Sequence, residues 1–274
     1  MRAPLLLHRS LLPSPLGRRL EQAYLNARAQ QVPHEPRLRW ASTAPEPGLA
    51  LVRQLAAALD TRGPGGNPYL RLVTELPAAV PDLDGPRLLQ AMRPVLVTTF
   101  SYAVPTEAVL QRLGASGEIV EIGAGGGYWA RCLHERGASV TAFDRILPVE
   151  QVRPGGRIIQ HHPVGIGGPA VALAAVPAAR TLLLCWPPGL INRDEVDAGA
   201  APTFSPMGHE ALDRFGGAQL VFVGDRIASF GSPDFFARLD DEWTLQERLL
   251  LPNLGTWRDA ACFYRRKNLV IAAG

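Results

Sequence analysis

Apolar positions divide the chain into two regions with different patterns. In residues 1–97 they recur at helical spacing in short stretches, near 18–31, 49–59, 69–76 and 86–92. Proline and glycine clusters such as residues 63–68 interrupt them. This pattern predicts a helical N-terminal region. We expect it to be a cap or an oligomerisation surface, and a substrate-binding lid is the alternative.

Residues 98–274 alternate helical stretches with short apolar runs. The runs at 118–122, 139–143, 157–160, 181–186 and 219–223 predict strands, with helical patterns at 105–113, 128–135 and 207–215. Such alternation predicts a doubly wound, mostly parallel α/β sheet with helices on both faces, which is a Rossmann-like fold. Two late runs, 243–250 and 260–265, are joined by a loop alone and predict an antiparallel hairpin at the edge.

Composition limits the classes of partner. Hydrophobic residues make up 47% of the chain and charged residues 19%, so a buried core is expected. The net charge is +3, Lys267 is the only lysine, and the arginines are dispersed, which argues against binding to a nucleic-acid backbone. Three scattered cysteines favour a reducing, cytoplasmic setting, and no apolar run approaches the roughly 20 residues of a membrane span.

The most informative motif follows the first predicted strand. Residues 123–127 read Gly-Ala-Gly-Gly-Gly and lead directly into a predicted helix. Glycines let the backbone turn sharply and approach a ligand closely, and a helix start presents unpaired N–H groups. The spacing is G-x-G-x-G, because Tyr128 stands where the dinucleotide fingerprint G-x-G-x-x-G has its third glycine.

Two carboxylates bear on the choice of ligand. Glu121, two positions before Gly123, would repel the pyrophosphate of a dinucleotide but would favour the ammonium and sulfonium cations of S-adenosylmethionine (SAM). Asp144 ends the second predicted strand, where its oxygens can accept the two ribose hydroxyls. Enzymes that use NAD share that second feature.

Residues 121–127 resemble the first signature motif of the class I SAM-dependent methyltransferases. Residues 100–107 and 182–188 also resemble a branch of that superfamily, so the resemblance extends over about 98–270. It implies that the glycines wrap the methionyl part, that Glu121 helps to hold it and that Asp144 binds the ribose. The predicted cofactor-binding residues are therefore Tyr102, Glu121, Gly123, Ala124, Gly125, Gly127, Asp144 and His162.

The acceptor side has weaker signals. Amino-methyltransferases often carry Asn or Asp, then Pro-Pro and an aromatic residue, after the fourth strand, whereas this chain has Trp186 before its prolines and Gly189 after them. Methylation of a nucleic-acid base is therefore not favoured. We expect Trp186 to wall the acceptor site, or to pack a rigid Pro-Pro turn. His209 is the candidate general base, and His162 is expected after the third strand, near the adenine.

The sequence predicts a helical region at 1–97 and a SAM-binding domain at 98–274 that moves a methyl group to an N, O or S nucleophile. We expect a small-molecule or peptide acceptor and no metal. An NAD(P)-dependent oxidoreductase and a non-catalytic SAM-binding or interaction protein are the alternatives. Residues 251–259 are expected to form a connecting loop, and a contribution to the acceptor pocket is the alternative.

Overall fold

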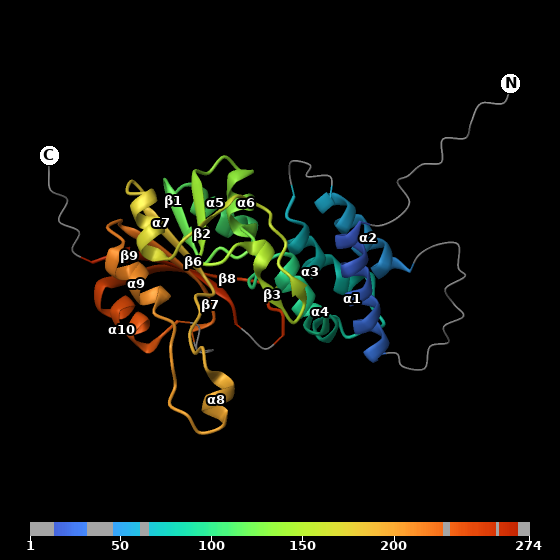
Figure 1. Cartoon of the computed structure of the whole chain (residues 1–274). Helices are drawn as coiled ribbons and strands as arrows, with labels where there is room; N and C mark the ends of the chain where they lie inside the picture. Colours follow the sequence, from blue (N-terminus) through green and yellow to red (C-terminus); the bar gives the residue numbers. More distant parts are fainter. Residues whose placement is uncertain (1–13, 32–45, 61–65, 227–230, 256–257, 268–274) are drawn as a thin grey trace. The chain divides into compact units, whose positions relative to one another are not determined.

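The computed structural model describes residues 14–31, 46–60, 66–226, 231–255 and 258–267 (Figure 1). The chain divides into two compact units, Met1–Val95 and Leu96–Gly274.

The first unit is helical, as the pattern predicts. Its helices are α1 (Pro15–Gln31), α2 (Pro47–Asp60), α3 (Pro68–Ala79) and the larger part of α4 (Gly85–Thr99), which continues into the second unit. The Tyr24 hydroxyl of α1 donates to Glu46 Oε2 (2.7 Å), and Glu46 also accepts the N–H of Leu49 at the start of α2 (3.0 Å). Pro94, a residue type that ordinarily ends a helix, lies within α4, which is therefore longer than predicted.

The second unit is built on a seven-stranded sheet in the order β5-β2-β1-β6-β7-β9-β8. Parallel pairing joins β5 to β2, β2 to β1, β1 to β6 and β6 to β7, whereas β9 runs antiparallel to both of its neighbours. The order and direction of the strands confirm the predicted doubly wound fold and its edge hairpin. The strands are β1 (Ile119–Ile122), β2 (Val140–Asp144), β5 (Val164–Ile166), β6 (Thr181–Cys185), β7 (Gln219–Gly224), β8 (Trp243–Leu250) and β9 (Ala260–Arg266).

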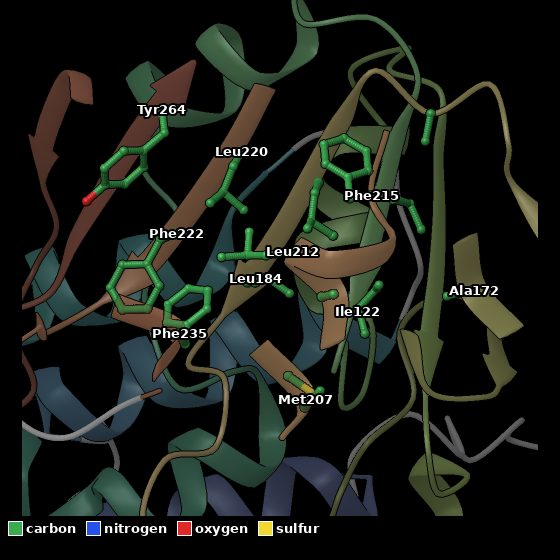
Figure 2. Packing of buried hydrophobic residues seen from close by; sticks show 14 of the residues in the cluster. Ile122, Ala172, Leu184, Met207, Leu212, Phe215, Leu220, Phe222, Phe235 and Tyr264 are labelled. Atoms are coloured by element: carbon green, nitrogen blue, oxygen red, sulfur yellow. The ribbon is translucent and has the colours of Figure 1, made fainter. Parts of the chain in front are cut away.

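Helices cover both faces of this sheet. On one face α7 (Pro169–Ala175), α9 (Met207–Arg214) and α10 (Pro233–Glu242) bury a large apolar cluster. Figure 2 shows Leu184 and Phe222 from the sheet beside Leu212 of α9 and Phe235 of α10. On the other face α6 (Tyr128–His134) places Ala130 against Ala142 and Val164, and α5 (Glu107–Gly114) contacts α6. A short helix, α8 (Arg193–Asp197), lies on the long connection between β6 and α9 (Figure 1).

The prediction of a third strand at 157–160 is wrong. The third strand of the main sheet is β5, and residues 156–157 form β4 (Gly156–Arg157), which pairs with β3 (Val152–Arg153) in a separate two-stranded sheet. The N–H of Ile159 donates to the carbonyl of Thr98 (2.9 Å), so the apolar segment after β4 pairs with the end of α4 and not with β2. The pattern also did not predict α7, α8 and α10.

Candidate functional site

A cavity of about 400 Å³ lies at the carboxyl ends of β1, β2 and β6. The chain leaves β1 toward β2 and β5 on one side, and later returns to β6 on the other side of β1. Ligands of open α/β sheets bind at such a switch in strand order. All lining residues belong to the second unit: Val97, Phe100, Ser101, Tyr102, Glu121, Ile122, Gly123, Ala124, Gly125, Gly126, Trp129, Asp144, Arg145, Ile146, Gln151, Arg153, Ile158, Gly167, Cys185, Trp186, Pro188, Gly189, Leu190, Arg193 and Met207.

The glycine turn after β1 forms the floor of this cavity. Gly123 and Gly125 have φ angles of 77° and 55°, in the left-handed region that favours glycine. The N–H groups of Gly123 and Ala124 both donate to the carbonyl of Phe143 (2.9 and 3.0 Å), which fixes the turn against β2. A Cβ added to Gly125 would have no atom within 4 Å, so this position faces open space in the cavity.

Gly126 and Gly127 serve the packing of the turn. A Cβ on Gly126 would lie 2.0 Å from the carbonyl oxygen of Ile159, and one on Gly127 would lie 3.0 Å from Cβ of His162. Gly127 has a φ of 71° and caps the start of α6. It does not line the cavity, although the resemblance predicted that it would bind the cofactor; Gly126 lines it instead.

Asp144 ends β2 and connects two segments around the cavity. Its Oδ2 accepts the N–H of Gly125 (2.9 Å) and its Oδ1 accepts the N–H of Ile146 (3.2 Å). Each carboxylate oxygen can accept more than one hydrogen bond, so both keep capacity for a ligand. Asp144 therefore orders the glycine turn and can also hold a pair of hydroxyl groups.

Glu121 is a carboxylate buried beneath the cavity. It is 2% exposed, and a backbone hydrogen bond from Ala130 in the first turn of α6 reaches it. Its Oε2 atom is buried and has no hydrogen-bond partner among the described residues. Burial raises the pKa of Glu121 from 4.5 to about 8, and the nearby charge of Asp144 contributes to the rise. A cation in the cavity would satisfy Oε2 and favour the ionised carboxylate.

Two aromatic side chains form one wall of the cavity. The ring of Tyr102 stacks on that of Trp186, with centroids 5.0 Å apart and planes inclined by 19°. The indole Nε1 of Trp186 donates to Asp259 Oδ1 (2.9 Å), and the guanidinium of Arg153 lies 6.0 Å from the Tyr102 centroid. The structure thus brings both aromatic residues that the sequence singled out to the same cavity as Glu121.

The predicted histidines do not line the cavity. His161 and His162 precede β5, so the expectation that His162 follows the third strand is wrong. The ring of His162 lies 5.4 Å from that of His134, and burial lowers the pKa of His162. Burial also lowers the pKa of His161 to about 4, and its Nε2 lies 2.5 Å from the carbonyl oxygen of Thr99.

His209 lies on α9, where its Nε2 is 3.4 Å from Asp213 Oδ2, one turn further along the helix. Met207, two residues earlier, is the residue of α9 that lines the cavity. The structure therefore does not bring the predicted base to the other candidate residues.

Sequence reasoning missed several lining residues. Arg145 directly follows Asp144, and Gln151 and Arg153 lie next to and within the small β3–β4 sheet, whose short strands have no clear periodicity. Gly167 lines the cavity directly after β5; its place could be found only once β5 was located. Cys185, the last residue of β6, lines it too, and burial raises the pKa of its thiol.

The loop at 251–259 contributes Asp259 to the support of Trp186, while Trp257 lies outside the described residues. Across the described ranges, no group of three or more His, Cys, Asp or Glu side chains is arranged to hold a metal ion. None of the described helices has the length and apolar character needed to cross a membrane.

Comparisons with family models and with curated proteins give no match. Among solved structures, the chain is similar to a candidate tRNA (m1A22) methyltransferase of Streptococcus pneumoniae, with 13% identity, 61% of this chain and 71% of that chain covered, and a TM-score of 0.37. It is also similar to the tRNA (uracil-54, C5)-methyltransferase of Pyrococcus abyssi in complex with S-adenosyl-L-homocysteine. These two chains are 17% identical, the match covers 62% of this chain and 39% of that chain, and the TM-score is 0.35. A mitomycin 7-O-methyltransferase is 13% identical; the match covers 85% of this chain and 76% of that chain, with a TM-score of 0.35.

This chain spans about two fifths of the length of the Pyrococcus abyssi protein. With identities of 13–17% and TM-scores of 0.35–0.37, these likenesses carry no argument about this chain. The fold class rests on the order and direction of the strands.

Proposed function

We propose that the protein is a SAM-dependent methyltransferase that binds its cofactor in the cavity between the glycine turn and the Tyr102–Trp186 wall. The observation that carries this proposal is Glu121, a buried carboxylate whose Oε2 has no hydrogen-bond partner among the described residues. Leaving such an atom unpaired is costly, which favours a ligand that places a positive group there. The methionyl ammonium and the sulfonium of SAM are groups of this kind.

The other cavity residues fit the rest of the cofactor. The open position at Gly125 admits close approach of a ligand to the backbone, and Asp144 has acceptor capacity for two ribose hydroxyls. A volume of about 400 Å³ lies within the range of small-molecule sites. A dinucleotide fits less well, because its pyrophosphate would meet Glu121 at the glycine turn.

Bound SAM supplies an activated methyl group, so the protein has to hold a nucleophile in line with it and exclude water. Positioning of this kind can contribute on the order of 7–11 kcal/mol to catalysis. We assign it to the rigid wall formed by Trp186 and Tyr102. We assign no base, because His209 does not line the cavity.

We propose a small-molecule or peptide acceptor with an N, O or S nucleophile. The net charge of +3 and the dispersed arginines favour this choice over a nucleic acid, whose backbone needs a concentrated basic surface. The absence of Asn or Asp before Pro187 also disfavours transfer to the amino group of a base.

The proposal is tested by incubating the full chain with methyl-labelled SAM and fractionated small molecules and peptides from a cell extract. We expect label in a fraction with the wild type and, at the same low SAM concentration, much less label with Glu121→Gln. Trp186→Ala should lower turnover by more than it lowers SAM affinity, because the ring walls the acceptor side. No transfer to any fraction by a protein that binds SAM would instead favour a non-catalytic SAM-binding protein.

A further inference from the structure

The aromatic wall contains a backbone outlier. Trp186 has a φ of 51° and is the one residue other than glycine, within the described segments, with a positive φ. A bulky side chain in this left-handed region is uncommon, and such outliers gather at functional sites. Trp186 stands between Cys185, the last residue of β6, and Pro187, so the unusual turn sets the indole at the edge of the sheet where the cavity opens.

Hydrogen bonds from its backbone and from its indole hold Trp186 in this conformation. Its backbone N–H donates to the carbonyl of Val223 (2.8 Å), and its indole Nε1 donates to Asp259 Oδ1 (2.9 Å) in a buried contact. The backbone of Asp259 is itself fixed: its N–H donates to Asn253 Oδ1 (3.2 Å), and its carbonyl accepts the N–H of Leu251 (3.0 Å). The loop between β8 and β9 therefore places the carboxylate of Asp259 behind the cavity wall. Asp259 is only 4% exposed to solvent.

Fixing Trp186 also fixes its neighbour. Tyr102 stacks on the indole at 5.0 Å, and both rings line the same cavity as Glu121. Asp259 does not line the cavity, so it reaches a ligand only through the indole. Aromatic rings attract cations through their electron-rich faces, so the orientation of the indole decides how the pair can meet a cation in the cavity.

We propose that Asp259 is a positioning residue, which orients Trp186 so that the Tyr102–Trp186 pair favours the sulfonium of SAM over the uncharged thioether of S-adenosyl-L-homocysteine. This inference rests on the proposed function. The two ligands differ by one methyl group and its positive charge, so the ratio of their affinities reports on the surroundings of the sulfur. A site that favours the charged form keeps substrate bound in preference to its product.

The test is calorimetric titration of the full chain with SAM and with S-adenosyl-L-homocysteine. Asp259→Leu removes the acceptor and Trp186→Phe removes the donor while keeping an aromatic ring. Each should lower the ratio of SAM affinity to S-adenosyl-L-homocysteine affinity by roughly 2- to 30-fold, the range of a cation–aromatic contact. Asp259→Asn is the matched control, because its amide oxygen can still accept the indole N–H; its ratio should stay near that of the wild type.

The ratio separates positioning from general stability, since a loss of folded protein lowers both affinities together. The double variant Trp186→Phe/Asp259→Leu should be no worse than either single variant, because both remove the same bond. If Asp259→Leu does not fold, Trp186→Phe decides alone. An unchanged ratio in Trp186→Phe, or a loss in Asp259→Asn equal to that in Asp259→Leu, overturns the inference. Failure of the proposed function is distinct, because the wild type would then bind neither ligand.

Discussion

The burial of Glu121 in the candidate site makes the stability of the folded protein depend on pH. The ligand-free protein keeps this carboxyl protonated up to a pKa of about 8, whereas an unfolded chain ionises it near 4.5. Folding therefore takes up a proton between these two values. The stabilisation from the protonated form is complete below pH 4.5 and is lost as the pH rises toward 8.

We predict that the free energy of unfolding of the full chain falls between pH 5 and pH 8 by on the order of a few kcal/mol because of this group. Glu121→Gln, which stays neutral, should remove that part of the slope and be the more stable protein at pH 8. Urea unfolding at several pH values measures it. Glu150→Gln, at an exposed position of a short 3-10 helix (Pro148–Glu150), is the control and should leave the slope as it is. Equal slopes in the wild type and Glu121→Gln would contradict the burial argument.

The sequence predicted Glu121 as a cofactor residue, but not its burial or its unpartnered oxygen. The pattern places it in a strand, next to a glycine turn. Its orientation toward α6 and the hydrogen bond from Ala130 depend on how the helix packs against the strand, which one sequence does not specify. Trp186 is similar: the Pro-Pro motif marks the turn, whereas the bond to Asp259, 73 residues later, depends on the hairpin loop returning to β6.

Among the elements, the turn between β1 and α6 is the one whose geometry was most predictable. Glycines at 123, 125 and 127 predict a sharp turn, and in the structure all three have positive φ. The third strand was the least predictable, because β5 has only three residues and contains Gly165. The apolar residues before β5, around Ile158, look more like a strand in the sequence than β5 does. In the structure they lie beside the cavity and the end of α4. Because the third strand was predicted too early in the chain, His162 was expected after it, whereas His162 precedes β5.

The glycine turn can be tested against a matched turn elsewhere. Gly125 and Gly137 both have positive φ (55° and 81°), and a Cβ on either would have no atom within 4 Å, but only Gly125 lines the cavity. Gly125→Val and Gly137→Val should each lower the free energy of unfolding by about 1–2 kcal/mol through backbone strain. SAM binding, measured by calorimetry, should be lost in Gly125→Val and kept in Gly137→Val. Retained affinity in Gly125→Val would place the cofactor elsewhere.

For the molecule as a whole, the change of pattern near residue 97 predicts domains at 1–97 and 98–274, and this division stays a prediction. The chain divides into two compact units, Met1–Val95 and Leu96–Gly274. Strand direction and the edge hairpin follow from the alternation of elements, since parallel strands need helical crossovers and a short loop joins antiparallel ones. The role of the N-terminal helices as a cap, an oligomerisation surface or a lid stays a prediction. Every residue that lines the candidate site belongs to the second unit.

We propose above that this cavity recognises the cations of SAM through Glu121. The most direct test is calorimetric titration of the wild type and Glu121→Gln with SAM and with NAD at pH 7, repeated in buffers with different heats of ionisation. We predict that the wild type binds SAM with release of a proton from Glu121 and does not bind NAD. Glu121→Gln should bind SAM roughly 10- to 150-fold more weakly, as expected for losing a hydrogen bond to a charged group, and without that proton release. Binding of NAD by a wild-type protein that gives no heat with SAM would contradict the account.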